Sequence, residues 1–349
     1  RIHETPTPKQ LETIRQVTRR APGFARGWGH LALTEASLGE IDDAGVAPDT
    51  MEKRAYRAAS REHLLRARAL DPALPETYLA EAMLVVDPGQ WGERLAIYER
   101  GLAVAQDARL YDYRSLDLTR VGRVADALES ARRSVALDPL SPRSRNALIS
   151  NLAYSGATGS ARAELEAAER LWPGSEAMRE VRFRFDLRFG DAANALRMMD
   201  DPRFAPVIGN PGGQPILRAF LRARLDPTSA NIEAAVNAAT RQQLARYGPK
   251  DRLIQTLGYF ARVDDAYRLL DAPGTAELWR ATTEVLMRAQ MRSIRHDRRF
   301  MALAKRIGLL DYWRTTGKWP DFCDDADLPY DCKVEAKRFS GAGATATKG

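Results

Sequence analysis

Cysteine and long apolar runs are both scarce in this sequence. The 349 residues include two cysteines, Cys323 and Cys332. The longest apolar stretch lies near Ala82–Val86, far short of the roughly twenty residues that a membrane-spanning helix needs. No signal-peptide pattern occurs at the start, and the first residue is Arg1 rather than Met. We therefore expect a preceding segment, which could be a signal, a membrane anchor or another domain, and we expect membrane association only through such an anchor.

Motifs of catalysis are missing as well. The sequence contains no H-E-x-x-H, no G-x-S-x-G and no Walker motif. The glycine-rich stretch Gly209–Gly213 lacks the G-x-G-x-x-G form and is typical of a connector. The carboxylates of Glu35, Glu81 and Asp112 are predicted to be solvated or salt-bridged. We expect a protein that is not an enzyme, with no cofactor and no metal ligands.

Lysine is rare, and the positive charge is carried almost entirely by arginine. The net charge is +7, but the basic residues are interspersed with acidic ones, as in Arg15–Arg20, Arg179–Arg188 and Arg292–Arg299. Phosphate binding favours a basic face with few acids on it. The pattern therefore predicts a solvated surface of mixed charge and no direct nucleic-acid binding by this chain.

Proline and small residues recur with a period near 34. The phrase Ala-Leu-Asp-Pro ends at Pro72 and again at Pro139, 67 positions later, and Pro173 lies 34 positions further on. Small and large apolar residues fall in register within these periods. The members of this register are Trp28, Leu31, Ala32, Gly39, Leu118, Gly122, Ala127, Ala131, Leu148, Leu152, Gly156, Ala161, Leu165 and Ala168. Antiparallel helices need small residues where their backbones approach, a turn residue between them and a proline to start the next helix.

This register resembles the tetratricopeptide pattern. The resemblance implies pairs of antiparallel helices that stack on their neighbours, because one pair alone cannot bury its apolar face. We predict an all-α fold, a right-handed superhelix of tetratricopeptide-like helix pairs with a capped, loop-rich C-terminal segment. The predicted parts are repeats over 1–199 with an insertion over 40–54 that reads as a loop, a linker over 200–215, further helical repeats and a cap over 216–339, and a flexible tail over 340–349. Helices are expected at Leu11–Arg20, within Glu176–Met199, at Asn231–Tyr247, within Asp251–Leu270, at Glu277–Ile294 and at Arg299–Arg306.

The stretch Ser293–Cys323 carries a second resemblance. The residues concerned are Asp297, Arg299, Phe300, Leu303, Gly308, Leu309, Tyr312, Trp313, Trp319, Pro320, Asp321, Phe322 and Cys323. They resemble the terminal segment of bacterial membrane-integrated one-component transcription regulators, which join a cytoplasmic winged helix-turn-helix to an extracytoplasmic tetratricopeptide region. No winged helix is present in this sequence. From the residues alone, the aromatic side chains are predicted to cap the last repeat, with a partner-binding patch as the alternative.

Four states are open to Cys323 and Cys332. A zinc site lacks further ligands, because His3, His30, His63 and His296 have no ligand spacing. A redox pair of the C-x-x-C type has a different spacing. Two free thiols would suit a reducing cytosol. A disulfide would close a ten-residue loop and stabilise the fold by roughly 2–3 kcal/mol, and it would favour an oxidising compartment, which in a bacterium is the periplasm.

In a stack of helix pairs, the first helix of each pair lines one face. We predict that this face forms a concave groove for a protein or peptide partner, since Tyr and Arg favour such contacts. The candidate residues are Arg26, His30, Met83, Asp87, Arg109, Asp112, Tyr113, Leu116, Arg120, Asn146, Ser150 and Tyr154. We expect the extracytoplasmic sensing or interaction part of a signalling protein; the alternatives are a free-standing periplasmic scaffold or assembly factor, and a cytoplasmic adaptor if the thiols are free.

Overall fold

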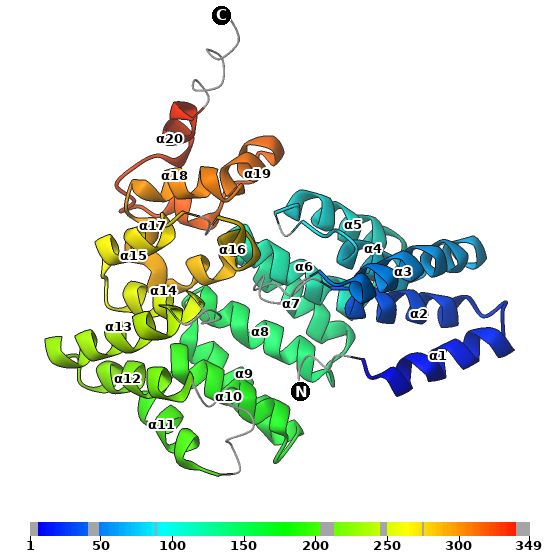
Figure 1. The fold of residues 1–349 in the computed structure, drawn as a ribbon, viewed down its shortest axis with the longest axis horizontal. Helices are drawn as coiled ribbons and strands as arrows, with labels where there is room; N and C mark the ends of the chain where they lie inside the picture. Colours follow the sequence, from blue (N-terminus) through cyan, green and yellow to red (C-terminus); the bar gives the residue numbers. More distant parts are fainter. Residues whose placement is uncertain are drawn as a thin grey trace, which may run out of the picture. The chain divides into compact units, whose positions relative to one another are not determined.

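The computed structural model describes residues 6–40, 49–87, 89–202, 213–244, 250–273 and 276–339. Within these ranges every regular element is a helix and none is a strand, which confirms the all-α prediction. Most of the helices pack in adjacent pairs, drawn along the chain in Figure 1. The handedness of the superhelix stays a prediction. None of the described helices is both long and apolar enough to cross a membrane.

The chain divides into two compact units. Unit 1 comprises residues 1–118 and 126–148, and unit 2 comprises residues 119–125 and 149–349. The boundaries fall within α6, α7 and α8, so the turn at 119–125 belongs to unit 2. The first eight helices are α1 (Pro8–Arg20), α2 (Ala25–Leu38), α3 (Met51–Leu70), α4 (Pro75–Met83), α5 (Trp91–Val104), α6 (Ala108–Arg120), α7 (Val124–Leu137) and α8 (Pro142–Tyr154).

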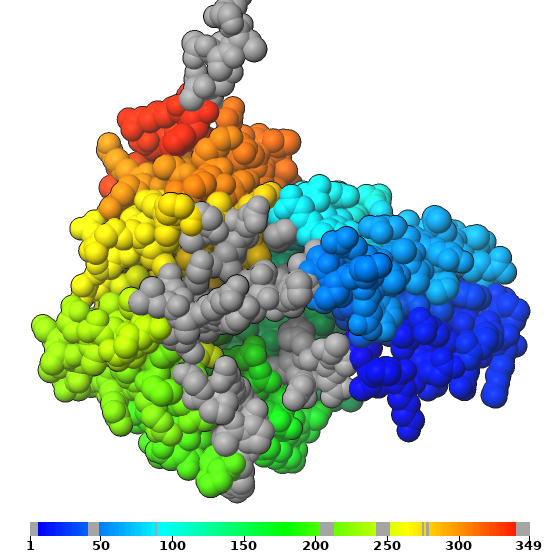
Figure 2. All heavy atoms as spheres, viewed as in Figure 1, coloured from blue at the N-terminus to red at the C-terminus, as the bar shows by residue number. Residues whose placement is uncertain are grey.

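Small residues bring the first helices of unit 1 close together. Helix α2 packs against both α3 and α4, and the alanines at 32, 36, 67 and 80 are fully buried at these contacts. The hydroxyl of Ser60 on α3 donates to the carbonyl of Ala32 on α2 at 2.8 Å. Side chains of one or two heavy atoms permit this approach, as the repeat register predicts. In the space-filling view the atoms of α3 lie at the surface of this unit, in blue (Figure 2).

The predicted insertion is shorter on its C-terminal side than expected. Helix α3 begins at Met51, so Met51–Arg54 is helical rather than loop. Thr50 explains the start, because its hydroxyl accepts the backbone N–H of Lys53 at 3.2 Å and so caps the helix. Residues 41–48 of the insertion lie outside the described residues, as do 203–212 of the predicted linker and the tail from 340 on.

The elements of unit 2 after α8 are mostly short. They are α9 (Thr158–Leu171), α10 (Glu176–Arg188), α11 (Ala192–Asp200), α12 (Gln214–Leu225), α13 (Ser229–Leu244), α14 (Lys250–Tyr259), α15 (Val263–Leu270), α16 (Ala276–Ala281), η2 (Thr283–Met287), η3 (Ala289–Met291), α17 (Arg292–Arg295), α18 (Arg299–Arg306), α19 (Leu309–Thr316), η4 (Asp321–Asp324) and α20 (Cys332–Arg338). Of the predicted turn glycines, Gly122 and Gly156 adopt φ of +82° and +84°, in the left-handed region that favours glycine, whereas Gly39 has φ of −83°.

One predicted helix, Glu277–Ile294, is wrong. The chain instead forms α16, two short 3-10 segments and α17, with Arg288 in an extended conformation between them. The break is stabilised by two buried arginines. Arg295 donates to the carbonyls of Leu286 at 2.6 Å and Arg288 at 2.8 Å, which a continuous helix would have satisfied internally. The Arg288 side chain turns to Gln255 on α14.

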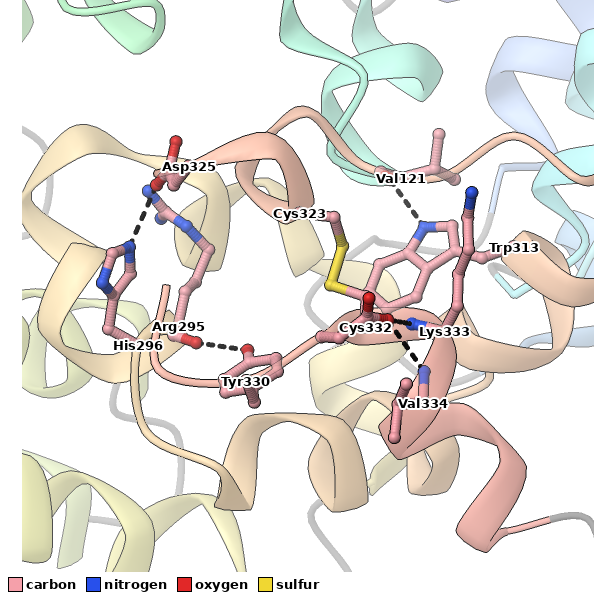
Figure 3. The surroundings of a disulfide bond; sticks show 11 residues. Val121, Arg295, His296, Trp313, Cys323, Asp325, Tyr330, Cys332, Lys333 and Val334 are labelled. Carbon is pink, nitrogen blue, oxygen red and sulfur yellow. Dashed lines mark hydrogen bonds and ion pairs between the residues drawn. A yellow bond between two sulfur atoms is a disulfide. The ribbon is translucent and has the colours of Figure 1, made fainter. Parts of the chain in front are cut away.

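Most of the C-terminal aromatics are buried, as the capping prediction requires, and Trp319 is half-buried. Trp313 is fully buried and packs edge-on against Phe322, which in turn packs edge-on against Phe300. The indole of Trp313 donates to the carbonyl of Val121 at 2.9 Å, a contact visible in Figure 3. The segment therefore covers the turn between α6 and α7 in addition to the neighbouring helices of unit 2.

Pro320 and Asp321 of the same segment also contact the turn between α6 and α7. The backbone N–H of Asp321 donates to the carbonyl of Gly122 at 3.0 Å. The Asp321 carboxylate accepts the N–H of Ala125, in the first turn of α7, at 2.7 Å. Pro320 sits directly on Gly122: a Cβ at position 122 would lie 2.6 Å from the Cβ of Pro320. We call Trp313–Phe322 the C-terminal strap.

The two cysteines are joined. The disulfide between Cys323 and Cys332 spans a Cα–Cα distance of 5.8 Å, so the zinc, C-x-x-C and free-thiol interpretations are wrong for this structure. The enclosed loop is fixed by its own polar contacts. The hydroxyl of Tyr330 donates to the carbonyl of Arg295, and Asp325 lies 3.0 Å from the Nε2 of His296 (Figure 3). A loop of this size has little apolar area of its own, and these contacts replace it.

Candidate binding surface

The predicted groove residues fall in both units. Unit 1 holds nine of them and unit 2 holds Arg120, Ser150 and Tyr154. We describe the two sets separately. In unit 1 the first helices of the pairs are α2, α4, α6 and α8. We call the ion-paired residues that join these helices to one another the first-helix surface. It includes His30, Arg109, Asp112 and Tyr113 from the sequence prediction.

Glu76 is the centre of the first cluster on this surface. Its Oε1 accepts a hydrogen bond from Arg109 at 2.8 Å and lies 3.5 Å from the Nε2 of His30, so α2, α4 and α6 are linked through one carboxylate. The carboxylate side chain is 3% exposed, whereas the side chains of Arg109 and His30 are 37% and 45% exposed. The cations therefore cover the anion on its solvent side.

The partial burial of this cluster beside Glu76 also shifts the pKa values of His30 and Arg109. Burial lowers the pKa of His30 below its usual value, although the nearby carboxylate of Glu76 opposes the shift. Burial also acts to lower the pKa of Arg109, but hydrogen bonds to Asp107 and Glu76 prevail and raise it. Arg109 thus stays a permanent cation, while His30 is held toward its neutral form.

A second cluster joins α6 to α8. The guanidinium of Arg143 donates to the carboxylate of Asp112 and, at 3.1 Å, to the hydroxyl of Tyr113. Its Cζ lies 4.0 Å from the centre of the Tyr113 ring, a cation–π contact. Burial raises the pKa of Asp112, with the charge of Arg143 opposing the shift. Sequence reasoning found Asp112 and Tyr113 but missed Arg143.

A third cluster joins α2 to α1 and α3, outside the first-helix surface. Glu35 is fully buried and bonds to Arg15 at 3.1 Å and to the Nδ1 of His63 at 2.6 Å. The same design therefore occurs three times: a buried carboxylate on α2, α4 and α6 lies beneath a partly exposed arginine, whose side chain is 40% exposed at Arg15 and 26% at Arg143. The prediction that Glu35 is a salt-bridged carboxylate is consistent with this pairing.

A positional pattern could have revealed the missed residues. The second residues of α2, α4, α6 and α8 are Arg26, Glu76, Arg109 and Arg143. One column of the repeat therefore carries three arginines and the glutamate that links two of the first helices. This column can be recognised only when the helices are aligned at their first residues. The repeat register in the sequence predicts the first residue of each helix only to within a turn.

The remaining predicted residues are scattered. Arg26 and Leu116 are exposed, Met83 and Asn146 are half-buried, and none of these four enters the clusters. The Asp87 carboxylate accepts the N–H of Gly89 at 2.8 Å and so shapes the loop after α4.

In unit 2, the three remaining candidates point to interior contacts. Arg120 is 8% exposed and lies 3.5 Å from Glu284. The hydroxyl of Tyr154 accepts a hydrogen bond from Arg288 at 3.3 Å, and Ser150 is half-buried. Arg120 and Tyr154 thus support the packing of unit 2.

One group among the described residues has the spacing of a metal site, formed by His296, Asp325 and Asp327. Arg292 already forms ion pairs with both carboxylates, at 3.8 Å to Asp325 and more closely to Asp327. A hydrogen bond from Arg292 holds the pKa of Asp327 below its usual value. The group is therefore an ion-pair network that anchors the disulfide loop, and we assign no metal to it.

Comparison with known proteins gives no family. No protein-family model matches the chain, and no curated protein matches it. The functional argument therefore depends on the residues themselves.

Proposed function

We propose that this chain is a protein- or peptide-binding helical-repeat module, and that the first-helix surface of unit 1 is where the partner docks. The observation that carries the proposal is the pair of buried carboxylates, Glu76 on α4 and Asp112 on α6, each beneath a partly exposed arginine of another first helix. Partial exposure of the cations lowers their desolvation cost, and it also places guanidinium groups at the surface. The exposed part of Arg109 can then meet acceptor groups of an incoming partner.

The geometry of these cations suits recognition. Arg109 and Arg143 are each held by a buried carboxylate, so less conformational entropy is lost when these side chains contact a partner. Tyr113, stacked on Arg143, adds a rigid aromatic of the kind enriched in binding hot spots. Arg26 extends the same column and makes no ion pair with any described residue. We expect a partner segment that supplies carboxylate or carbonyl acceptors to these side chains.

The biological setting we propose is extracytoplasmic signalling. The disulfide between Cys323 and Cys332 favours an oxidising compartment, and the terminal signature resembles that of membrane-integrated transcription regulators. On this proposal the chain senses or relays a signal in the periplasm and takes no direct part in DNA binding. Sequencing the coding region upstream of Arg1 tests it: a membrane span and winged helix support the proposal, and a cleavable signal peptide alone favours a free-standing periplasmic scaffold.

The binding surface is tested by charge reversal. The partner is first identified by photo-crosslinking in the native host from the exposed positions 26 and 30. The Arg26→Glu variant should then weaken binding at least tenfold, because a repulsive carboxylate replaces an available guanidinium. Arg132→Glu is the matched control, since Arg132 is an exposed arginine on the second helix α7 and makes no ion pair with a described residue. Equal affinity of the two variants would refute the assignment of this surface.

The alternative of a cytoplasmic adaptor requires free thiols, and the disulfide between Cys323 and Cys332 disfavours it. Mass spectrometry of freshly purified, unreduced protein after alkylation decides the matter. Modification of both Cys323 and Cys332 would favour the adaptor, and protection of both would favour the periplasmic proposal.

A further inference from the structure

A second surface of unit 1 is hollowed out between α3 and α5. The hollow has a volume of about 780 Å3 and is open to solvent. Its apolar lining includes Leu64, Leu65, Leu84 and Val86. Two of these side chains are unusually accessible for their type, Leu65 with 66% and Val86 with 41% of its surface exposed. None of the ion-pair clusters of the first-helix surface lines it.

The hollow exists because one first helix is short. Helix α4 has nine residues, whereas α6 and α8 have thirteen each. At a rise of about 1.5 Å per residue, the missing four residues leave a gap of about 6 Å, slightly more than one helical turn. The chain leaves α4 at Met83 and starts α5 only at Trp91. The segment Leu84–Asp87 lines the hollow in place of a further turn of α4.

The walls of the hollow are fixed rather than collapsible. Trp91 is fully buried and anchors the start of α5. The guanidinium of Arg94 forms two hydrogen bonds with the carboxylate of Asp117, at 2.8 and 3.0 Å, and both side chains are buried. A bidentate buried pair of this kind holds α5 in one position. The apolar lining is thus preorganised, and binding there would require little rearrangement.

The rim carries one unused charge of each sign. Arg61 stands on α3 and Glu93 on α5, and neither forms an ion pair with a described residue. Both are exposed. The remaining charged residues of the lining have partners within the chain: Arg68 and Glu81 form an ion pair, and the Asp87 carboxylate accepts the N–H of Gly89. An occupant can therefore gain attraction from an acidic group near Arg61 and a basic group near Glu93.

We infer that this hollow, the α3–α5 site, binds an amphipathic helix of a partner protein. The helix would place apolar side chains one turn apart on Leu65 and Val86, and so replace the turn that α4 lacks. It would carry an acidic residue toward Arg61 and a basic residue toward Glu93. A helix in an apolar groove with flanking charges is a common mode of recognition. The site is distinct from the proposed partner surface on the first helices.

The test uses the full, disulfide-bonded chain and a displayed library of fourteen-residue peptides. Each peptide has leucine at two positions one helical turn apart, helix-forming residues elsewhere, and randomised positions flanking the leucines. We expect enrichment of peptides with an acidic residue on one flank and a basic residue on the other. Selected peptides should be helical when bound, and Leu65→Asp should weaken them at least tenfold. Leu140→Asp is the matched control, because Leu140 is 67% exposed and lies outside the hollow.

Exchanging the charges of Arg61 and Glu93 tests the predicted orientation of the bound helix more specifically than Leu65→Asp does. The double variant Arg61→Glu, Glu93→Arg should prefer the peptide with its two flanking charges exchanged, by about tenfold over the original. Arg26→Glu should leave peptide affinity unchanged, which separates this site from the first-helix surface. The proposal is overturned if no peptide is enriched over scrambled sequences, if enriched peptides bind in an extended conformation, or if Leu65→Asp has no effect. Self-association that Leu65→Asp abolishes would identify a second copy as the occupant and would also overturn it.

Discussion

Substitution of two turn glycines by alanine measures how much the C-terminal strap contributes to unit 2. Gly122 and Gly156 have nearly the same conformation, with φ of +82° and +84°. A Cβ at position 156 meets nothing within 4 Å, whereas a Cβ at position 122 would lie 2.6 Å from Pro320 Cβ and 3.2 Å from Met287 Sδ. The two substitutions therefore carry the same backbone cost and differ in the contacts of the added Cβ, of which the one with Pro320 of the strap is the shortest.

The expected magnitudes follow from these distances. An alanine in the left-handed region costs roughly 1–2 kcal/mol, and this is the whole effect expected for Gly156→Ala. Gly122→Ala adds the displacement of Pro320, for which overpacking of a fixed contact costs typically 1–3 kcal/mol. The difference between the two variants should thus be about 2 kcal/mol.

Urea denaturation under non-reducing conditions, followed by far-UV circular dichroism, gives the two losses of stability. Hydrogen exchange supplies the local measurement, because the N–H of Asp321 bonds to the carbonyl of Gly122. Gly122→Ala should accelerate exchange of the Asp321 amide, whereas in Gly156→Ala this amide should exchange at the wild-type rate. Equal losses of stability, together with unchanged exchange at Asp321, would refute the docking of the strap on this turn.

Three further predictions concern charge and the disulfide. Replacing Cys323 and Cys332 by serine should lower the free energy of unfolding by about 2–3 kcal/mol, seen as a lower urea midpoint that matches the reduced wild type; identical midpoints of oxidised and reduced wild type would contradict this. Because the pKa of His30 is lowered in the folded state, stability should be fully present above the ordinary value near 6.5 and decline as the pH falls toward the folded pKa. His30→Gln should flatten this decline in urea titrations between about pH 5 and 7, and an unchanged slope would exclude His30 as its source. Arg109→Met should cost about 2 kcal/mol, since Glu76 would remain buried without its main partner, and calorimetry should show partial rescue when Glu76→Gln is added.

The pattern of small residues predicted the helix pairs well, since helix packing is local and repetitive. Ala161, Leu165 and Ala168 are fully buried in α9, and Gly122 and Gly156 are turn glycines with positive φ. The steric requirement at these positions, a small side chain at a helix contact or a glycine in a turn, recurs in every helix pair. The period and composition of the sequence are therefore enough to predict it.

The departures from prediction have a common physical cause, which is long-range polar contact. The break between α16 and α17 depends on carbonyl contacts from Arg295, which no helical periodicity reveals. The bond from Trp313 to Val121 joins residues 192 positions apart. On the first-helix surface, Glu76 and Arg143 were missed because a charged residue at a helix start usually faces water. Burial of such a residue is decided by the neighbouring repeat.

The Asp321 carboxylate completes the first turn of α7 from a point 196 positions further along the chain. At a synthesis rate of roughly 5–20 residues per second, α7 would leave the ribosome about 10–40 s before the aspartate that caps it is made. Until then the start of α7 exposes unsatisfied amides, and Gly122 lacks its cover. Residues 119–125 can therefore reach their final contacts only after the C-terminal strap has been synthesised, and a truncation that removes the strap should first disturb residues 119–125.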